Sequence, residues 1–201
     1  MIEFKKNVNK VLPYDRRQYS EFFDDDFDSS NDSIKWYGVS FQEESEGRKV
    51  SLTEFIEMFE SLFKNIILKL DNGSFWIVNH NYSGAVWFPN DEDNLTKLRT
   101  LFKQRNVPNT YRGALICTKD DLIEFSRELI SYPCAVFNRE NSLYDNLDVS
   151  HSEFQFVITI SGHKCIDFLS TDKELIRKVV NENSSSLFIV KEYRGTSLWT
   201  K

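Results

Sequence analysis

The stretch SLTEFIEMFESLFKNIILKL, residues 51–70, carries the strongest structural signal in the chain. Its apolar residues recur every three or four positions, which is the spacing of one face of an α-helix. Ser51 and Glu54 match a capping box at the start of this pattern, and the turn residues Asp-Asn-Gly follow its end. We therefore expect a helix over residues 52–69 with its apolar face buried in the core. That face includes Phe55, Phe59 and Phe63.

Two elements are expected upstream of this helix. Aromatic residues recur at helical spacing and predict a first helix from about Tyr14 to Phe23. The following SIKWYGVSF reads as a strand, because apolar residues alternate through most of it. The alternation shifts phase near its middle, where Gly38 permits a β-bulge.

Downstream, short apolar runs alternate with amphipathic stretches. SFWIVNHN and GAVWFP are separated by a short turn and predict a hairpin. Helices are expected after this hairpin, from Thr118 to Pro133, and after a capping box of Thr171 and Glu174. Residues 138–151 are polar and predict a long exposed loop. Further strands are expected at GALICT, CAVF, CIDFL, SLFIVKEY and SEFQFVITIS, the last of which alternates like a strand covered on one face.

The order of these elements indicates the fold class. Residues 74–117 and 153–193 share the order strand, strand, helix, strand. We expect an α+β fold, with helices packed on a mixed or antiparallel sheet and an arrangement of two ββαβ-like halves as one version of it. A doubly wound dinucleotide-binding fold is disfavoured, because single strands and helices do not alternate strictly. The length predicts a single domain over residues 1–201, with its core at 51–193 and an acidic segment at 13–60.

Composition excludes several classes of protein. Hydrophobic residues make up 40% and aromatic residues 14% of the chain, which excludes intrinsic disorder. No stretch approaches about 18 uninterrupted apolar residues, and the first residues lack a signal-peptide core, so we expect no membrane span and a cytoplasmic location. The cysteines lack the spacing of a disulfide framework or a zinc site, so we expect reduced thiols, no metal and no cofactor. They are Cys117, Cys134 and Cys165.

The net charge of −6 is unevenly distributed along the chain. Residues 1–12 carry three lysines and one glutamate, a net charge of +2. Residues 13–60 carry 13 acidic and 5 basic side chains, a net charge of −8, and residues 61–201 carry 17 of each. The entire acidic excess therefore lies in one quarter of the chain. This asymmetry argues against direct binding of nucleic acid and favours a basic protein partner.

Aromatic residues interleave with the acidic residues of this segment. Aromatic anchors surrounded by charge are typical of tight protein interfaces. Two other interpretations stay open: the charges form a solvated surface, or the aromatic residues are buried beneath the sheet. The residues predicted to bind the partner are Glu21, Phe22, Asp24, Asp25, Asp26, Asp28, Asp32, Trp36, Tyr37, Glu43, Glu44 and Glu46.

Two histidines are the candidates for catalysis. His80 lies in VNHNYSG, whose polar residues suit a general base with donors but equally suit a turn. His163 and Cys165 are two positions apart and could face one metal, yet a zinc site needs three or four ligands. The chain contains no G-x-S-x-G elbow, H-E-x-x-H motif or P-loop, and the acidic run FFDDDFD lacks the glycine of a calcium loop. We expect no catalytic residue, with a small hydrolase or transferase using His80 or His163 as an alternative.

In its size, its acidity and its FFDDDFD segment, the chain resembles the immunity proteins that bacteria pair with secreted nuclease toxins. The resemblance is one of general type. It implies a non-enzymatic protein of a toxin–antitoxin or contact-dependent growth inhibition system, whose carboxylates take the place of nucleic-acid phosphates on a basic toxin surface. A regulatory adaptor or scaffold with the same acidic surface is a further alternative. The identity of the toxin and the oligomeric state stay open.

Overall fold

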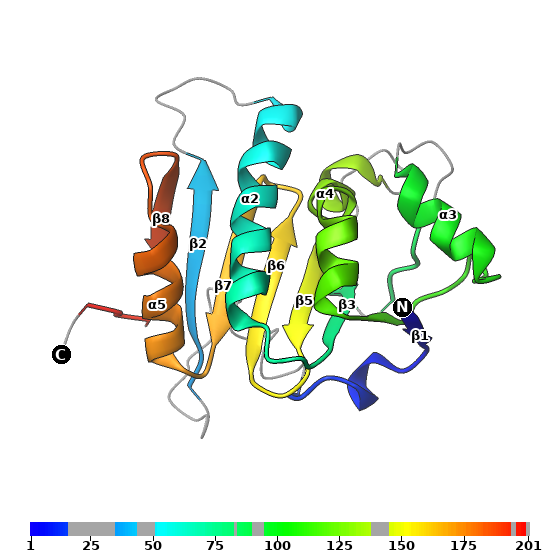
Figure 1. Cartoon of the computed structure of the whole chain (residues 1–201), viewed down its shortest axis with the longest axis horizontal. Helices are drawn as coiled ribbons and strands as arrows, with labels where there is room; N and C mark the ends of the chain where they lie inside the picture. Colours follow the sequence, from blue (N-terminus) through cyan, green and yellow to red (C-terminus); the bar gives the residue numbers. More distant parts are fainter. Residues whose placement is uncertain are drawn as a thin grey trace.

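The computed structural model describes residues 1–15, 35–43, 51–82, 84–89, 95–137, 145–193 and 196–199. These residues form an eight-stranded sheet in the order β1-β4-β3-β5-β6-β7-β2-β8, with every neighbouring pair antiparallel. Helices α2, α4 and α5 lie across one face of the sheet, and α3 lies beside α4 (Figure 1). The predicted α+β fold with helices packed on a sheet is confirmed. Within the described ranges, no helix is long and apolar enough to cross a membrane.

The strands are β1 (Glu3–Lys5), β2 (Tyr37–Glu43), β3 (Trp76–His80), β4 (Ala114–Cys117), β5 (Leu147–His151), β6 (Phe156–Ser161), β7 (Cys165–Ser170) and β8 (Phe188–Glu192). The helices are α2 (Leu52–Leu70), α3 (Thr96–Gln104), α4 (Lys119–Ala135) and α5 (Lys173–Asn183), and a single 3₁₀ turn, η1, covers Val8–Lys10.

Helix α2 begins and ends where the sequence predicts. The Ser51 hydroxyl accepts a hydrogen bond from the backbone N–H of Glu54 at 3.2 Å, and the Glu54 carboxylate accepts one from the Ser51 N–H at 3.0 Å. The phenylalanine face of the helix is fully buried against the sheet. Thr118 and Asp121 form the same reciprocal cap at the start of α4. Local sequence therefore defines the starts of the two central helices.

The predicted end of α4 is wrong. Pro133 does not stop the helix, which continues to Ala135, and the predicted CAVF strand is absent among these described residues. Proline removes only one helical hydrogen bond when it lies in the last turn. Burial of Tyr132 and Val136 in the core offsets that loss, and the Val136 N–H still bonds the Tyr132 carbonyl at 2.9 Å.

The predicted hairpin at residues 74–89 is also wrong. Strand β3 pairs with β4 and β5, and the described residues of GAVWFP form no strand. Trp87 is instead held by the loop before β4, where its Nε1 donates to the Gly113 carbonyl at 2.9 Å. Phe88 has a positive φ of 57°, which breaks the extended backbone that a strand requires. Only the second of the two expected ββαβ halves, β6-β7-α5-β8, has the predicted order.

Three smaller expectations have mixed outcomes. The predicted exposed loop is wrong at its end, because Leu147–His151 form the buried central strand β5. No bulge interrupts β2, whose register with β7 is continuous from Tyr37 to Gln42. Strand β6 is buried on both faces rather than on one. The predicted helix from Tyr14 to Phe23 lies almost entirely outside the described residues.

Candidate functional site

The strand register aligns five polar side chains across the middle of the sheet. Because side chains alternate along a strand, they all point to the back face, defined here as the face opposite the described helices. Ser40 pairs with Asp167, Asp167 with Thr159, Thr159 with Asp148, and Asp148 with Asn79. These five residues, called the polar row below, come from β2, β7, β6, β5 and β3. Their exposed fractions are only 1% to 7%.

Hydrogen bonds within the chain engage the donor groups of the polar row. The Thr159 hydroxyl donates to Asp148 Oδ1 at 2.8 Å, and Asn79 Nδ2 donates to the His80 carbonyl at 2.8 Å. The hydroxyls of Ser40 and Tyr193 hydrogen-bond the Asp167 carboxylate. Within the described residues, Asp167 Oδ1 and Asn79 Oδ1 accept no hydrogen bond. The row is therefore rich in acceptors that lack donors.

Burial raises the pKa of Asp167, and the hydrogen bonds from Ser40 and Tyr193 offset this only in part. No ion pair joins this carboxylate to a described lysine or arginine. An acidic group held in this way is costly to ionise unless a cation compensates it.

A second feature of the back face is a pair of aromatic rings, Tyr14 and Trp36, called the aromatic clasp below. The ring centroids are 5.4 Å apart in an edge-to-face arrangement, over Val157 and Leu169. The Tyr14 hydroxyl shares a 2.8 Å hydrogen bond with the Ser150 hydroxyl. Tyr14 and Trp36 lie next to Asp15 and Lys35, the described residues that flank the stretch 16–34, so the clasp brings the two sides of this stretch close together.

The structure places only three of the predicted partner-binding residues. Trp36 is 4% exposed, so its ring packs in the protein interior and is not an exposed anchor in this conformation. Tyr37 is half-buried, with the ammonium groups of Lys35 and Lys173 at 5.3 and 5.9 Å from its ring centroid. Glu43 is half-buried at the other end of β2. The others lie outside the described residues: Glu21, Phe22, Asp24, Asp25, Asp26, Asp28, Asp32, Glu44 and Glu46.

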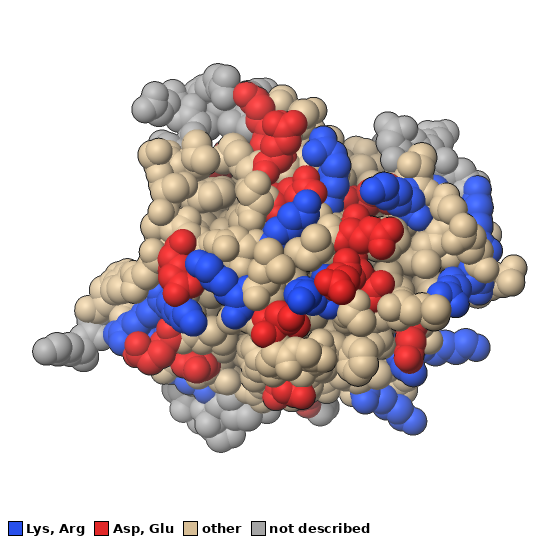
Figure 2. Space-filling model, in the orientation of Figure 1, with Lys and Arg blue, Asp and Glu red and all other residues tan. Residues whose placement is uncertain are grey.

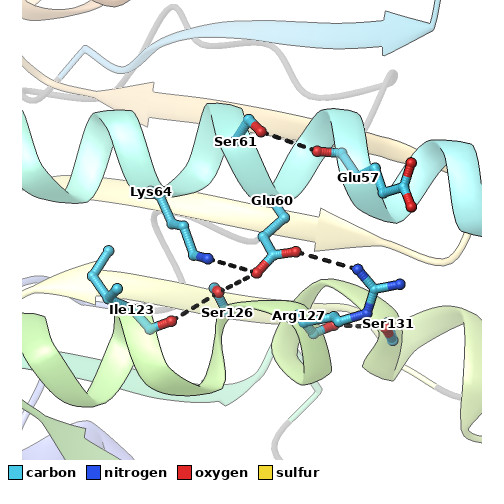
Figure 3. A network of polar contacts seen from close by, with 8 residues as sticks. All are labelled: Glu57, Glu60, Ser61, Lys64, Ile123, Ser126, Arg127 and Ser131. Carbon is cyan, nitrogen blue, oxygen red and sulfur yellow. Dashed lines mark hydrogen bonds and ion pairs between the residues drawn. The ribbon is translucent and has the colours of Figure 1, made fainter.

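The face covered by helices carries charges of both signs, as Figure 2 shows. Many of them serve contacts between helices. Figure 3 shows Glu60 of α2 between Lys64 Nζ at 2.7 Å, the Ser126 hydroxyl at 2.9 Å and Arg127 of α4 at 3.5 Å. Although burial acts in the opposite direction, the hydrogen bonds from Lys64 and Ser126 keep the pKa of Glu60 below its ordinary value. The described helical face is therefore not a one-signed acidic patch.

His80 lies in an aromatic cluster of the core. It is 3% exposed, its Nε2 lies 3.1 Å from the Tyr132 hydroxyl, and the rings of Trp87 and Tyr132 are 4.7 and 5.5 Å away. The same tyrosine hydroxyl accepts the Phe88 N–H at 3.2 Å. This geometry favours a structural role for His80.

Within the described residues, His163 and Cys165 belong to no group of metal ligands. His163 is exposed on the turn between β6 and β7, while Cys165 is half-buried at the start of β7. Burial raises the pKa of the Cys165 thiol to about 11, so the thiol is protonated near neutral pH. No group of three potential metal ligands occurs in the part of the chain that the structure describes.

A hollow of about 480 Å³ lies between α3, the start of α4 and the first residues of the chain. Leu101 and Phe125 supply apolar surface, Arg105 comes from α3, and Asp121 and Glu124 come from α4. Among the described residues, its lining contains no histidine, cysteine or serine. The hollow therefore combines apolar surface with acidic and basic side chains.

No known family model, curated protein or solved structure matches this chain.

The amino-acid sequence does not predict the polar row, although part of its local signal is present. In LDVSH, polar residues alternate with apolar ones at a period of two, which is typical of strands. The alternation predicts strands, but their alignment into one row depends on the strand order.

Proposed function

We propose that this chain is a non-enzymatic binding protein, an immunity protein that neutralises a basic bacterial toxin domain in the cytoplasm. The observation that carries the proposal is the location of the charge: residues 13–60 hold a net charge of −8, and the remainder of the chain supplies no acidic excess. The charges on the described helical face are mixed in sign. The acidic segment is therefore the part of the molecule best suited to a basic partner.

The proposed mechanism is occlusion. Residues 16–34 contain six carboxylates and two arginines, a net charge of −4. Carboxylates can occupy the positions that nucleic-acid phosphates take on a nuclease toxin, and opposite charge accelerates encounter. The aromatic clasp supports this mechanism, because a segment held at both ends loses less conformational entropy on binding than a free tail does.

The proposal expects a toxin gene beside the gene for this chain, and the test is the rate of association with the domain that such a gene encodes. We expect the Asp24→Asn, Asp25→Asn, Asp26→Asn triple variant to associate more slowly than the parent, with a weaker dependence on salt. Attraction between exposed charges is screened within about 8 Å at physiological ionic strength. If the proposal holds, folding stability should change little, because carboxylates that serve a partner need not contribute to folding.

The matched control removes three carboxylates from the helical face: Glu57→Gln, Asp120→Asn and Glu124→Gln, all of which are exposed. This variant has the same net charge as the first one. Slower association in the first variant alone supports the acidic segment as the interface. Association that is independent of salt and equal in the parent and both variants would overturn the proposal.

A further inference from the structure

The hydrogen bonds of the polar row leave two acceptor oxygens without a donor in the described residues. Its donors are engaged within the chain, as the bonds from Thr159 to Asp148 and from Asn79 to the His80 carbonyl show. Asp167 Oδ1 and Asn79 Oδ1 point into the row as acceptors with no donor in the described residues. Because Asp167 is 5% and Asn79 is 1% exposed, water does not compensate them freely, and buried acceptors of this kind are rare in native proteins. The missing component is a hydrogen-bond donor.

The carboxylates of the polar row indicate which kind of donor would fit. The row contains two carboxylates, Asp148 and Asp167, on strands separated only by β6. Adjacent strands are about 4.8 Å apart, so these carboxylates are about 10 Å apart along the row. This spacing is too wide for one metal ion or one nitrogen cation to contact both, so a single ligand group can engage only one of them. At Asp167, a nitrogen cation would supply several N–H donors and positive charge together.

We propose that the polar row is a binding site for a cationic nitrogen group, a guanidinium or an ammonium, held at Asp167. Where the cation belongs to a basic toxin side chain, this inference rests on the proposed function, and the row is then a second contact beside the acidic segment. The row approaches the surface at its β8 end, where Lys191 is exposed and Gln42 and Cys165 are half-buried. Because the row is buried in the free chain, binding requires local opening and is slow.

The test uses the full chain and two probes, L-argininamide and L-citrullinamide, both acetylated on the α-amino group so that this group carries no charge. We expect millimolar L-argininamide in this form to raise the thermal unfolding midpoint, and L-citrullinamide, whose side chain ends in a neutral urea, to raise it less. In Asp167→Asn, the apparent affinity for L-argininamide should fall at least tenfold. In the control Asp120→Asn, which removes an exposed carboxylate of α4, the response should be unchanged.

Spermidine distinguishes the sources of the cation. A midpoint shift with both L-argininamide and spermidine supports a site for nitrogen cations from any source, and a shift with L-argininamide alone supports a guanidinium from a protein. Equal shifts with L-argininamide and L-citrullinamide, or an unchanged response in Asp167→Asn, would overturn the proposal. The comparison of the two amides in the parent needs no variant. Because no toxin is present, failure of toxin binding and failure of this site are separate results.

Discussion

The central strands of the sheet are buried on both faces, but with different chemistry. Toward the helices, β2, β6 and β7 present Phe41, Ile158 and Phe168 to a continuous apolar core. On the back face, the same strands present the polar row, at nearly the same degree of burial. An apolar side chain gains free energy on burial, whereas a polar one loses it unless it is hydrogen-bonded. The helical face therefore supplies most of the stability of the fold. On the back face, burial of the polar row costs free energy and lowers the stability.

The largest effect is expected on the helical face, in Phe59→Ala. Phe59 is fully buried and its ring contacts those of Phe55 and Phe188, at centroid distances of 4.5 and 5.2 Å. Removing the ring leaves a cavity, so the free energy of unfolding should fall by about 3–5 kcal/mol. Urea denaturation measures this change. A fall below about 1 kcal/mol would mean that this face does not supply most of the stability.

An effect of opposite sign is expected on the back face, in Asp167→Asn. Burial raises the pKa of Asp167 in the folded chain above its unfolded value, near 3.9. The parent should therefore lose stability as the pH rises from about 4 through the folded pKa. The asparagine variant lacks this loss and should be more stable at pH 7 by about 1–3 kcal/mol, the usual cost of an uncompensated buried polar group.

Denaturation at pH 4 and at pH 7 tests this prediction, with Asp120→Asn as an exposed control. If Asp167→Asn is less stable than the parent at pH 7, a favourable charge on the back face would be established, and the contrast between the two faces would fail.

The smallest effect concerns His151, a buried titratable group on the helical side of β5. Its ring stacks on Phe154 at 3.7 Å and meets Trp76 edge-on, and its Nδ1 accepts the Glu153 N–H. Burial lowers the pKa of His151, despite the nearby carboxylates of Glu153 and Asp71. Its contribution to stability is therefore complete above the unfolded pKa of about 6.5 and is lost as the pH falls through the lower folded pKa.

Between pH 7 and pH 5, the loss should be up to about 1.4 kcal/mol for each pH unit. His151→Gln should reduce this acid sensitivity, whereas His163→Gln, at an exposed turn, should leave it unchanged. The two faces would then respond to pH in opposite directions. Equal acid sensitivity in the parent and in His151→Gln would remove this part of the comparison.

The amino-acid sequence by itself determined the elements whose signals are local. The capping boxes at Ser51 and Thr118 and the apolar face of α2 depend on residues three or four positions apart, so a short window contains the whole interaction. The alternation in the segment that forms β6 is similarly local. The charge asymmetry is a property of composition and needs no fold.

Only the tertiary structure decided which strands are neighbours and what each buried side chain contacts. Strand β3 lies beside β5 rather than in a hairpin with GAVWFP, and the polar row joins Ser40 to residues more than 100 positions away. The aromatic ring of Trp36 suits an interface and a core equally well in the sequence, and its contact with Tyr14 decided for the core. Strand pairing depends on packing between distant segments, and that energy is absent from any short stretch of the chain.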